Sequence, residues 1–103
     1  MPTRILLADI IAAVARAYKM KPKDLRRKSN EREYVEPRQV AIYLARTLTR
    51  ATLPQIGREL GKHHSTIYQS YVAVVARRTQ DTEYAAWVDR IATEIRAARA
   101  PAA

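Results

Sequence analysis

The stretch that decides the fold is Thr52-Leu53-Pro54-Gln55-Ile56-Gly57-Arg58-Glu59-Leu60-Gly61-Lys62-His63-His64-Ser65-Thr66-Ile67-Tyr68-Gln69-Ser70-Tyr71. Thr52 and Gln55 have the spacing of a capping box, in which each side chain bonds the backbone N–H of the other residue. Gly61 can adopt the left-handed conformation that ends a helix and lets the chain turn sharply. We therefore predict a short helix, a tight turn and a second helix.

The second helix of this stretch combines an apolar face with a polar first turn. Its apolar face is formed, at helical spacing, by Ile67, Tyr71, Val74 and Val75. Its polar start, residues 62–66, is left to point outward. Two helices joined by a glycine turn, with a polar leading edge on the second, are typical of a helix-turn-helix that enters the major groove of DNA.

The polar residues at this helix start carry groups that suit DNA. Ser65 and Thr66 can donate to a phosphate or to a base edge, and a histidine can donate to guanine. Gln69, one turn beyond Ser65, can pair with adenine. Free N–H groups at a helix start also suit phosphate. The alternative is that Ser65 and Thr66 only cap the helix, and the two roles are compatible.

Positive charge is concentrated before and within this motif. The chain has 19 Lys and Arg residues against 10 Asp and Glu residues, a net charge of +9. Residues 19–62 hold 12 basic and 5 acidic residues, whereas residues 1–18 and 63–103 each carry a net charge of only +1. Such a field suits a polyanion such as nucleic acid. A solubilising surface and an anionic membrane are the alternatives.

Residues 26–32 form the most basic segment, and they show no apolar period. We expect an exposed loop here. Beside a helix-turn-helix, such a loop is placed to hold phosphates or to enter a minor groove. Arg38 and Arg46 flank the helix that follows, as surface arginines that either contact the DNA backbone or have no role.

The whole pattern predicts an all-α helical bundle of about six helices in one domain, residues 1–98, with a disordered tail over 99–103. The expected helices are 3–19, 22–25, 36–48, 52–60, 62–78 and 82–98. Thr3 is expected to cap the first helix, and Asp81 or Thr82 the last. Pro37 opens the third helix, where its missing N–H costs nothing, and Thr47 helps to line its inner face. Trp87 is expected to pack in the core or at an interface.

The sequence offers none of the features that an enzyme needs. It has only two glycines and no cysteine, so a Gly-rich phosphate loop and a thiolate site are excluded. His63 and His64 are adjacent and would point about 100° apart on a helix, which does not suit a shared metal ion. No apolar run is long enough to span a membrane. We expect a cytoplasmic, nucleoid-associated protein with no cofactor, metal, membrane or small-molecule substrate.

Residues 10–74 resemble the C-terminal DNA-binding domain of the bacterial replication initiator DnaA. The resemblance rests on three blocks with matching spacing, residues 37–46 (Pro-Arg-Gln-Val-Ala-Ile-Tyr-Leu-Ala-Arg), 53–57 (Leu-Pro-Gln-Ile-Gly) and 61–67 (Gly-Lys-His-His-Ser-Thr-Ile). It implies a Trp-repressor-like fold that binds duplex DNA, with the second helix in the major groove and a basic loop in the adjacent minor groove. By position, His64, Ser65 and Thr66 would contact bases and Lys62 the backbone.

Two positions depart from the family pattern. His63 stands where the family has an aspartate, which accepts from cytosine or caps the helix. Asn30 stands where the family has a minor-groove arginine, and Arg27 or Arg32 is the expected substitute. The residues expected to contact DNA are Arg27, Lys28, Asn30, Arg32, Arg38, Thr52, Leu53, Pro54, Lys62, His63, His64, Ser65, Thr66 and Gln69.

The function expected from these features is sequence-specific binding of double-stranded DNA by a transcription regulator. The initiator's ATPase module is absent from this sequence, so we expect a stand-alone domain that does not hydrolyse ATP. An alternative is a replication-origin-binding modulator that competes with or assists the initiator. An alternative of another class is an adaptor whose last helix, with Tyr84 and Trp87, docks RNA polymerase or another regulatory protein.

Overall fold

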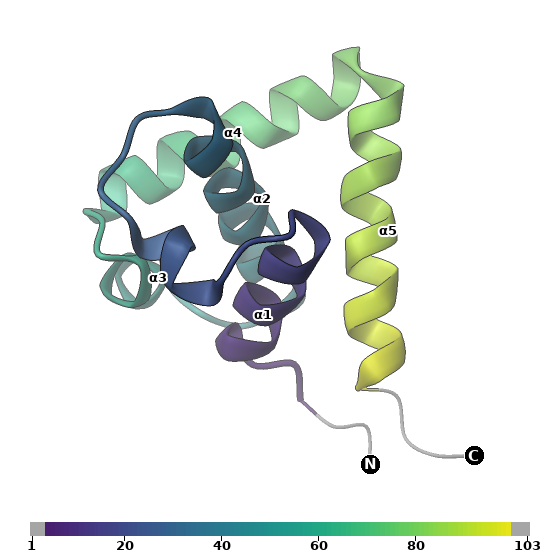
Figure 1. Ribbon diagram of the computed structural model, residues 1–103, viewed down its shortest axis with the longest axis horizontal. Helices are drawn as coiled ribbons and strands as arrows, with labels where there is room; N and C mark the ends of the chain where they lie inside the picture. Colours follow the sequence, from purple (N-terminus) through teal and green to yellow (C-terminus); the bar gives the residue numbers. More distant parts are fainter. Residues whose placement is uncertain (1–3, 100–103) are drawn as a thin grey trace.

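Five α-helices and one short 3-10 helix make up residues 4–99, the part of the chain that the computed structural model describes (Figure 1). In chain order they are α1 (Leu7–Ala17), η1 (Pro22–Arg26), α2 (Arg32–Leu48), α3 (Leu53–Leu60), α4 (His64–Gln80) and α5 (Thr82–Ala98). No strand occurs between residues 4 and 99. The predicted all-α class is confirmed, and the six elements agree with the predicted number.

Helix α2 lies at the centre of the protein and contacts every other element. Its buried face consists of aliphatic side chains that are at most 2% exposed: Val40, Ala41, Ile42, Leu44 and Ala45. Burial of a Val, Leu or Ile side chain stabilises a fold by about 1.5–3 kcal/mol. This face therefore holds α1, α3 and α4 around one core, which also includes Ile56, Leu60 and Ile67.

Helix α2 begins at Arg32, four residues earlier than predicted, and Pro37 lies inside it. Pro37 removes one backbone hydrogen bond, to the carbonyl of Glu33. Glu33 is exposed, so water can replace that bond, while Pro37 itself is buried in the core side of the helix. Arg32 consequently belongs to the first turn of α2 and Arg26 to η1, which shortens the predicted loop to residues 27–31.

The ends of the other helices also differ from the prediction. Helix α1 begins at Leu7, after a turn in which the Leu6 N–H donates to Asp9 (2.7 Å). The predicted cap, Thr3, lies outside the described residues. Helix α4 continues to Gln80, and of the two caps predicted for α5 it is Asp81 that caps the helix, by accepting from the Tyr84 N–H (3.0 Å).

Arg99, the first residue of the tail that we expect to be disordered, is the last residue that the structure describes. The Arg99 guanidinium is paired with the carboxylate of Asp9 in α1. This pair joins the end of the described chain to its beginning, and the hydrogen bond from Arg99 lowers the pKa of Asp9. Residues 100–103 lie outside the described part.

Two side chains predicted to face inward are exposed. Val75 is 41% exposed, because α4 packs on α2 through Ile67 and Val74 and leaves the next position on its outer side. Thr47 is also exposed, and its hydroxyl donates to the Tyr43 carbonyl one turn earlier (2.9 Å). Neither changes the path of the backbone.

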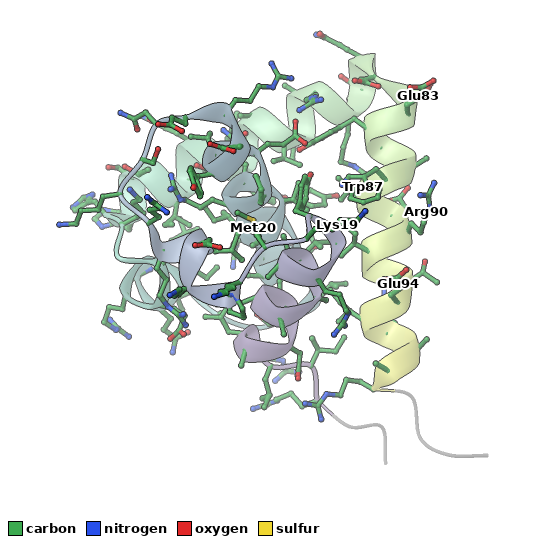
Figure 2. All side chains as sticks on the ribbon, in the orientation of Figure 1. Lys19, Met20, Glu83, Trp87, Arg90 and Glu94 are labelled. Atoms are coloured by element: carbon green, nitrogen blue, oxygen red, sulfur yellow. The ribbon has the colours of Figure 1, made fainter. Side chains whose placement is uncertain are left out.

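Helix α5 packs against α1 and α4 and forms the side of the molecule away from α3 (Figure 1). Trp87 lies on its inner side, near Lys19 (Figure 2), and its ring meets Tyr18 edge-on at 5.5 Å. Tyr84 is only 5% exposed. The packing role of Trp87 is confirmed. The two aromatic rings expected to dock a partner instead attach α5 to the core.

Glu36 of α2 links α1 and α4 through one carboxylate. It accepts from the Tyr18 hydroxyl (3.0 Å) and from the Arg77 guanidinium (2.8 Å). Arg77 also lies over the ring of Tyr84, 3.8 Å from its centre. Burial raises the pKa of Glu36, but the hydrogen bonds from Arg77 and Tyr18 together outweigh it, so the pKa lies below its ordinary value. Folding therefore favours the ionised carboxylate.

Substitution Glu36→Gln should reduce the free energy of unfolding at neutral pH by about 1 kcal/mol, because a partly exposed, charge-assisted bond is lost. The folded pKa of Glu36 is below the unfolded one, so its contribution is present above the unfolded pKa and is lost as the pH falls through the folded pKa. Urea titrations at neutral pH and at about pH 3 should show less acid destabilisation in the variant than in the wild type. Equal acid sensitivity of the two proteins would contradict this role.

Candidate nucleic-acid interface

Two glycines with different functions shape the turn between α3 and α4. Thr52 and Gln55 form the predicted capping box of α3, with N–H···O distances of 2.8 and 3.2 Å. Gly61 ends α3 with φ +68°, in the left-handed region, as predicted. Gly57 has a role that the sequence analysis missed. A Cβ atom there would lie 2.4 Å from the Lys62 carbonyl oxygen, while the Lys62 N–H donates to the Gly57 carbonyl (2.8 Å).

His63 is the N-cap of α4. Its Nδ1 atom accepts from the Ser65 backbone N–H (3.2 Å) and lies 2.8 Å from the Ser65 hydroxyl. The rings of His63 and His64 are in contact, with centres 4.1 Å apart. The cap is thus His63, and not Ser65 or Thr66 as one interpretation of the sequence had it. Ser65 and Thr66 lie in the first turn of the helix.

The first turn of α4 presents a row of exposed polar side chains. His64, Ser65, Thr66 and Gln69 are all exposed, and Ile67 between them is buried. The apolar side of the helix is therefore fixed in the core, and its polar side is left to solvent. A helix held in this way can enter a major groove without rearranging the protein.

Arg38 lies beneath the loop 27–31 and is only 6% exposed. Its guanidinium donates to three carbonyls, those of Leu25 (3.2 Å), Arg27 (2.5 Å) and Ser29 (3.2 Å). The prediction that Arg38 is a surface arginine is wrong. The Leu25 carbonyl belongs to η1, and those of Arg27 and Ser29 belong to the irregular loop that follows, where Arg38 supplies donors that a helix would otherwise provide.

A second arginine attaches the same region to the helix-turn-helix. Arg26, at the end of η1, donates from Nε to the Glu59 carbonyl (2.9 Å) and from Nη2 to the Glu59 carboxylate (2.5 Å). Such a two-point contact fixes orientation as well as distance. The loop 27–31 and the end of α3 are consequently held in one relative position.

Positive charges from the loop and from the turn lie close together. Burial lowers the pKa of Lys62, and the charges of Arg38 and Lys28 lower it further. The loop 27–31 and the α3–α4 turn lie at the same edge of the molecule, opposite α5 (Figure 1). A neighbouring anion would relieve this repulsion, which is the electrostatic property expected of a phosphate-binding surface.

The structure brings nearly all of the sequence-predicted residues to the protein surface. Lys62 and Leu53 are half-buried, and Arg38 is buried. The exposed members of the set are Arg27, Lys28, Asn30, Arg32, Thr52, Pro54, His63, His64, Ser65, Thr66 and Gln69. Arg26 and Gly57 are structural contributors that the sequence analysis did not identify. The signal for Gly57 was present, since it closes the block Leu-Pro-Gln-Ile-Gly.

Other kinds of site were sought in the same part of the chain. Among residues 4–99, no three His, Asp or Glu side chains are grouped so as to hold a metal ion. None of the helices described above is both long and apolar enough to cross a membrane.

Comparison with known proteins matches this region to one family. The family profile described as "Bacterial dnaA protein helix-turn-helix" matches residues 7–74. A chromosomal replication initiator protein DnaA from Lacticaseibacillus casei is 36% identical over 86 residues, 82% of this chain and 19% of the relative. That of Nitrobacter hamburgensis is 42% identical over 82 residues, 79% and 17% of the two chains.

A third relative extends the match. The DnaA protein of Rhodopseudomonas palustris is 37% identical over 95 residues, 91% of this chain and 20% of the relative. The chain thus spans about a fifth of the length of the curated relatives that it matches. The profile ends within α4, so α5 lies outside its matched residues.

Substitution Gly57→Ala should destabilise the protein by about 1–3 kcal/mol, because the new methyl group overlaps the Lys62 carbonyl and forces the turn open. Thermal unfolding should show a fall in Tm of several degrees or more. The control is Gly61→Asn, since asparagine tolerates a left-handed backbone and nothing lies within 4 Å of the added Cβ. Equal Tm values for Gly57→Ala and the wild type would contradict the close approach.

Substitution Arg38→Met should leave the carbonyls of Leu25, Arg27 and Ser29 without their charged donor. The free energy of unfolding should fall by about 1.5–3 kcal/mol. Methionine keeps much of the packing of the arginine stem. Amide hydrogen exchange should rise in residues 27–31 more than in α5. The matched control is Arg46→Met, which alters an exposed arginine of the same helix. Unchanged exchange in residues 27–31 would show that the loop does not depend on Arg38.

Proposed function

This chain belongs to the family of bacterial DnaA helix-turn-helix domains, and we propose that it binds double-stranded DNA in a sequence-specific manner. The observation that carries the proposal is the attachment of η1, which leads into the loop 27–31, to the helix-turn-helix by Arg26 and Glu59. This attachment sets the spacing between two surfaces, the polar start of α4 and the basic loop, so that one ligand can contact both. Duplex DNA, with adjacent major and minor grooves, is a ligand that fits both.

The first surface is the start of α4, which enters the major groove. His64, Ser65 and Thr66 contact base edges there, and Gln69 lies one turn further along the same exposed side. Ile67 and Val74 keep this helix docked on the core, so its orientation is set before binding. The base contacts supply the sequence preference.

The second surface is the loop with the start of α2, which contacts the minor groove or the phosphates through Arg27, Lys28, Asn30 and Arg32. Lys62, between the two surfaces, contacts the DNA backbone. Thr52, Leu53 and Pro54 approach the backbone from the start of α3. These contacts set position and affinity and weaken as the salt concentration rises. Arg38 acts indirectly, by shaping the loop.

The biological role supported best is binding of sites in a replication origin, where the protein competes with or assists the initiator. The relatives that it matches are named chromosomal replication initiator proteins, which favours this role over transcription regulation. A partner such as RNA polymerase has no support in these relatives. Action at origin DNA would place the protein at the nucleoid, in the cytoplasm.

The test is selection of duplexes from a random library by the purified full chain, followed by affinity measurements at several salt concentrations. Thr66→Ala should lose about 1–3 kcal/mol of binding free energy with the selected duplex and little with unselected duplexes. Lys28→Ala should weaken binding to all duplexes alike, and it should reduce the slope of log affinity against log salt concentration by about 1. Equal affinity for all sequences would refute the proposal. Genome-wide occupancy then separates the roles, with peaks at the origin for replication and at promoters for transcription.

A further inference from the structure

We infer that His63 presents a hydrogen-bond donor to the DNA, and that it favours guanine over cytosine at the base position that it faces. The inference rests on the proposed binding of α4 in the major groove. It concerns whether His63 donates or accepts in one contact, which follows from the hydrogen bonds that its imidazole makes inside the protein.

The cap interaction fixes the tautomer of His63. A backbone N–H can only donate, so the Nδ1 atom that receives the Ser65 N–H at 3.2 Å must be the acceptor. The Ser65 hydroxyl, 2.8 Å from the same atom, can donate to it as well. A neutral imidazole with an unprotonated Nδ1 carries its proton on Nε2. The second ring nitrogen is therefore a donor.

The donor is directed away from the cap and is available to a ligand. Nε2 lies on the opposite side of the ring from the atom that bonds Ser65, and His63 is exposed. The neighbouring ring of His64, 4.1 Å away, restricts rotation of the His63 ring. The cap and the neighbouring ring together restrict the orientation of one N–H at the leading edge of α4.

The major-groove edges of the bases respond differently to such a donor. Guanine offers two acceptors, O6 and N7, whereas cytosine offers only its N4 amine, which is itself a donor. A fixed N–H therefore pairs with guanine and is left unpaired against cytosine, and an unpaired buried donor is costly. A carboxylate at the same position would have the opposite preference, since it can only accept.

Substitution of His63 by aspartate should keep the fold and replace the donor in this contact by an acceptor. Aspartate is among the preferred N-cap residues, so His63→Asp can still accept from the Ser65 N–H. Its carboxylate accepts where the imidazole donated. His63→Ser also caps the helix, but its side chain is too short to reach a base. The three proteins thus share a helix start and differ in what they offer the groove.

The experiment is parallel selection from a random duplex library with the wild-type chain, His63→Asp and His63→Ser. Wild type should prefer guanine over cytosine at one position by about tenfold. His63→Asp should reverse the preference at that position alone, and His63→Ser should abolish it.

The outcomes separate this inference from the proposed function. Selection of no sequence by any of the proteins would refute sequence-specific binding, and the inference with it. A single consensus shared by all three would refute the inference alone, and it would indicate a phosphate contact at His63. Nitrogen NMR of the free wild-type protein should show the His63 proton on Nε2. A proton on Nδ1 would overturn the inference without reference to DNA.

Discussion

The rest of the interface depends on the buried guanidinium of Arg38. Removing a charge from water costs several kcal/mol, and hydrogen bonds to a charged group return about 1.5–3 kcal/mol each. Three carbonyls at 2.5–3.2 Å satisfy Arg38, so its net contribution to stability is modest. Its main effect is on geometry, because the end of η1 and the loop that follows it are held to α2 at three points. Arg26 and Glu59 then fix that segment to the end of α3.

This arrangement explains how a small domain can contact DNA with two elements at once. A flexible basic loop would lose backbone conformational entropy on binding, at about 1–2 kcal/mol for each residue that becomes fixed. Here the backbone is ordered in advance, and only the side chains of the loop must settle. The same holds for α4, whose first turn is set by the His63 cap, by Gly57 and Gly61, and by the buried Ile67. Loop and helix are therefore ordered before any ligand binds.

Local signals made the helix-turn-helix predictable. Capping residues, a left-handed glycine and apolar spacing all act within a few residues, and they give the bounds of α3 and most of the buried faces of both helices, with Val75 as the exception. The start of α2 and the role of Arg38 were mispredicted because they depend on distant partners. Glu36, in the first turns of α2, is held by Arg77, and Arg38 bonds carbonyls 9–13 residues earlier. His63 was identified as unusual, but its use as the cap required the position of the Ser65 N–H.

The central claim is that the loop 27–31 and the start of α4 bind one duplex together. The most direct measurement is an NMR titration of the isotope-labelled protein with its selected duplex, following backbone amides residue by residue. Amides of residues 27–31 and of residues 62–69 should shift along one common saturation curve, with one Kd, while those of α5 stay in place. Shifts confined to one of the two segments, or two segments that saturate at different DNA concentrations, would contradict it.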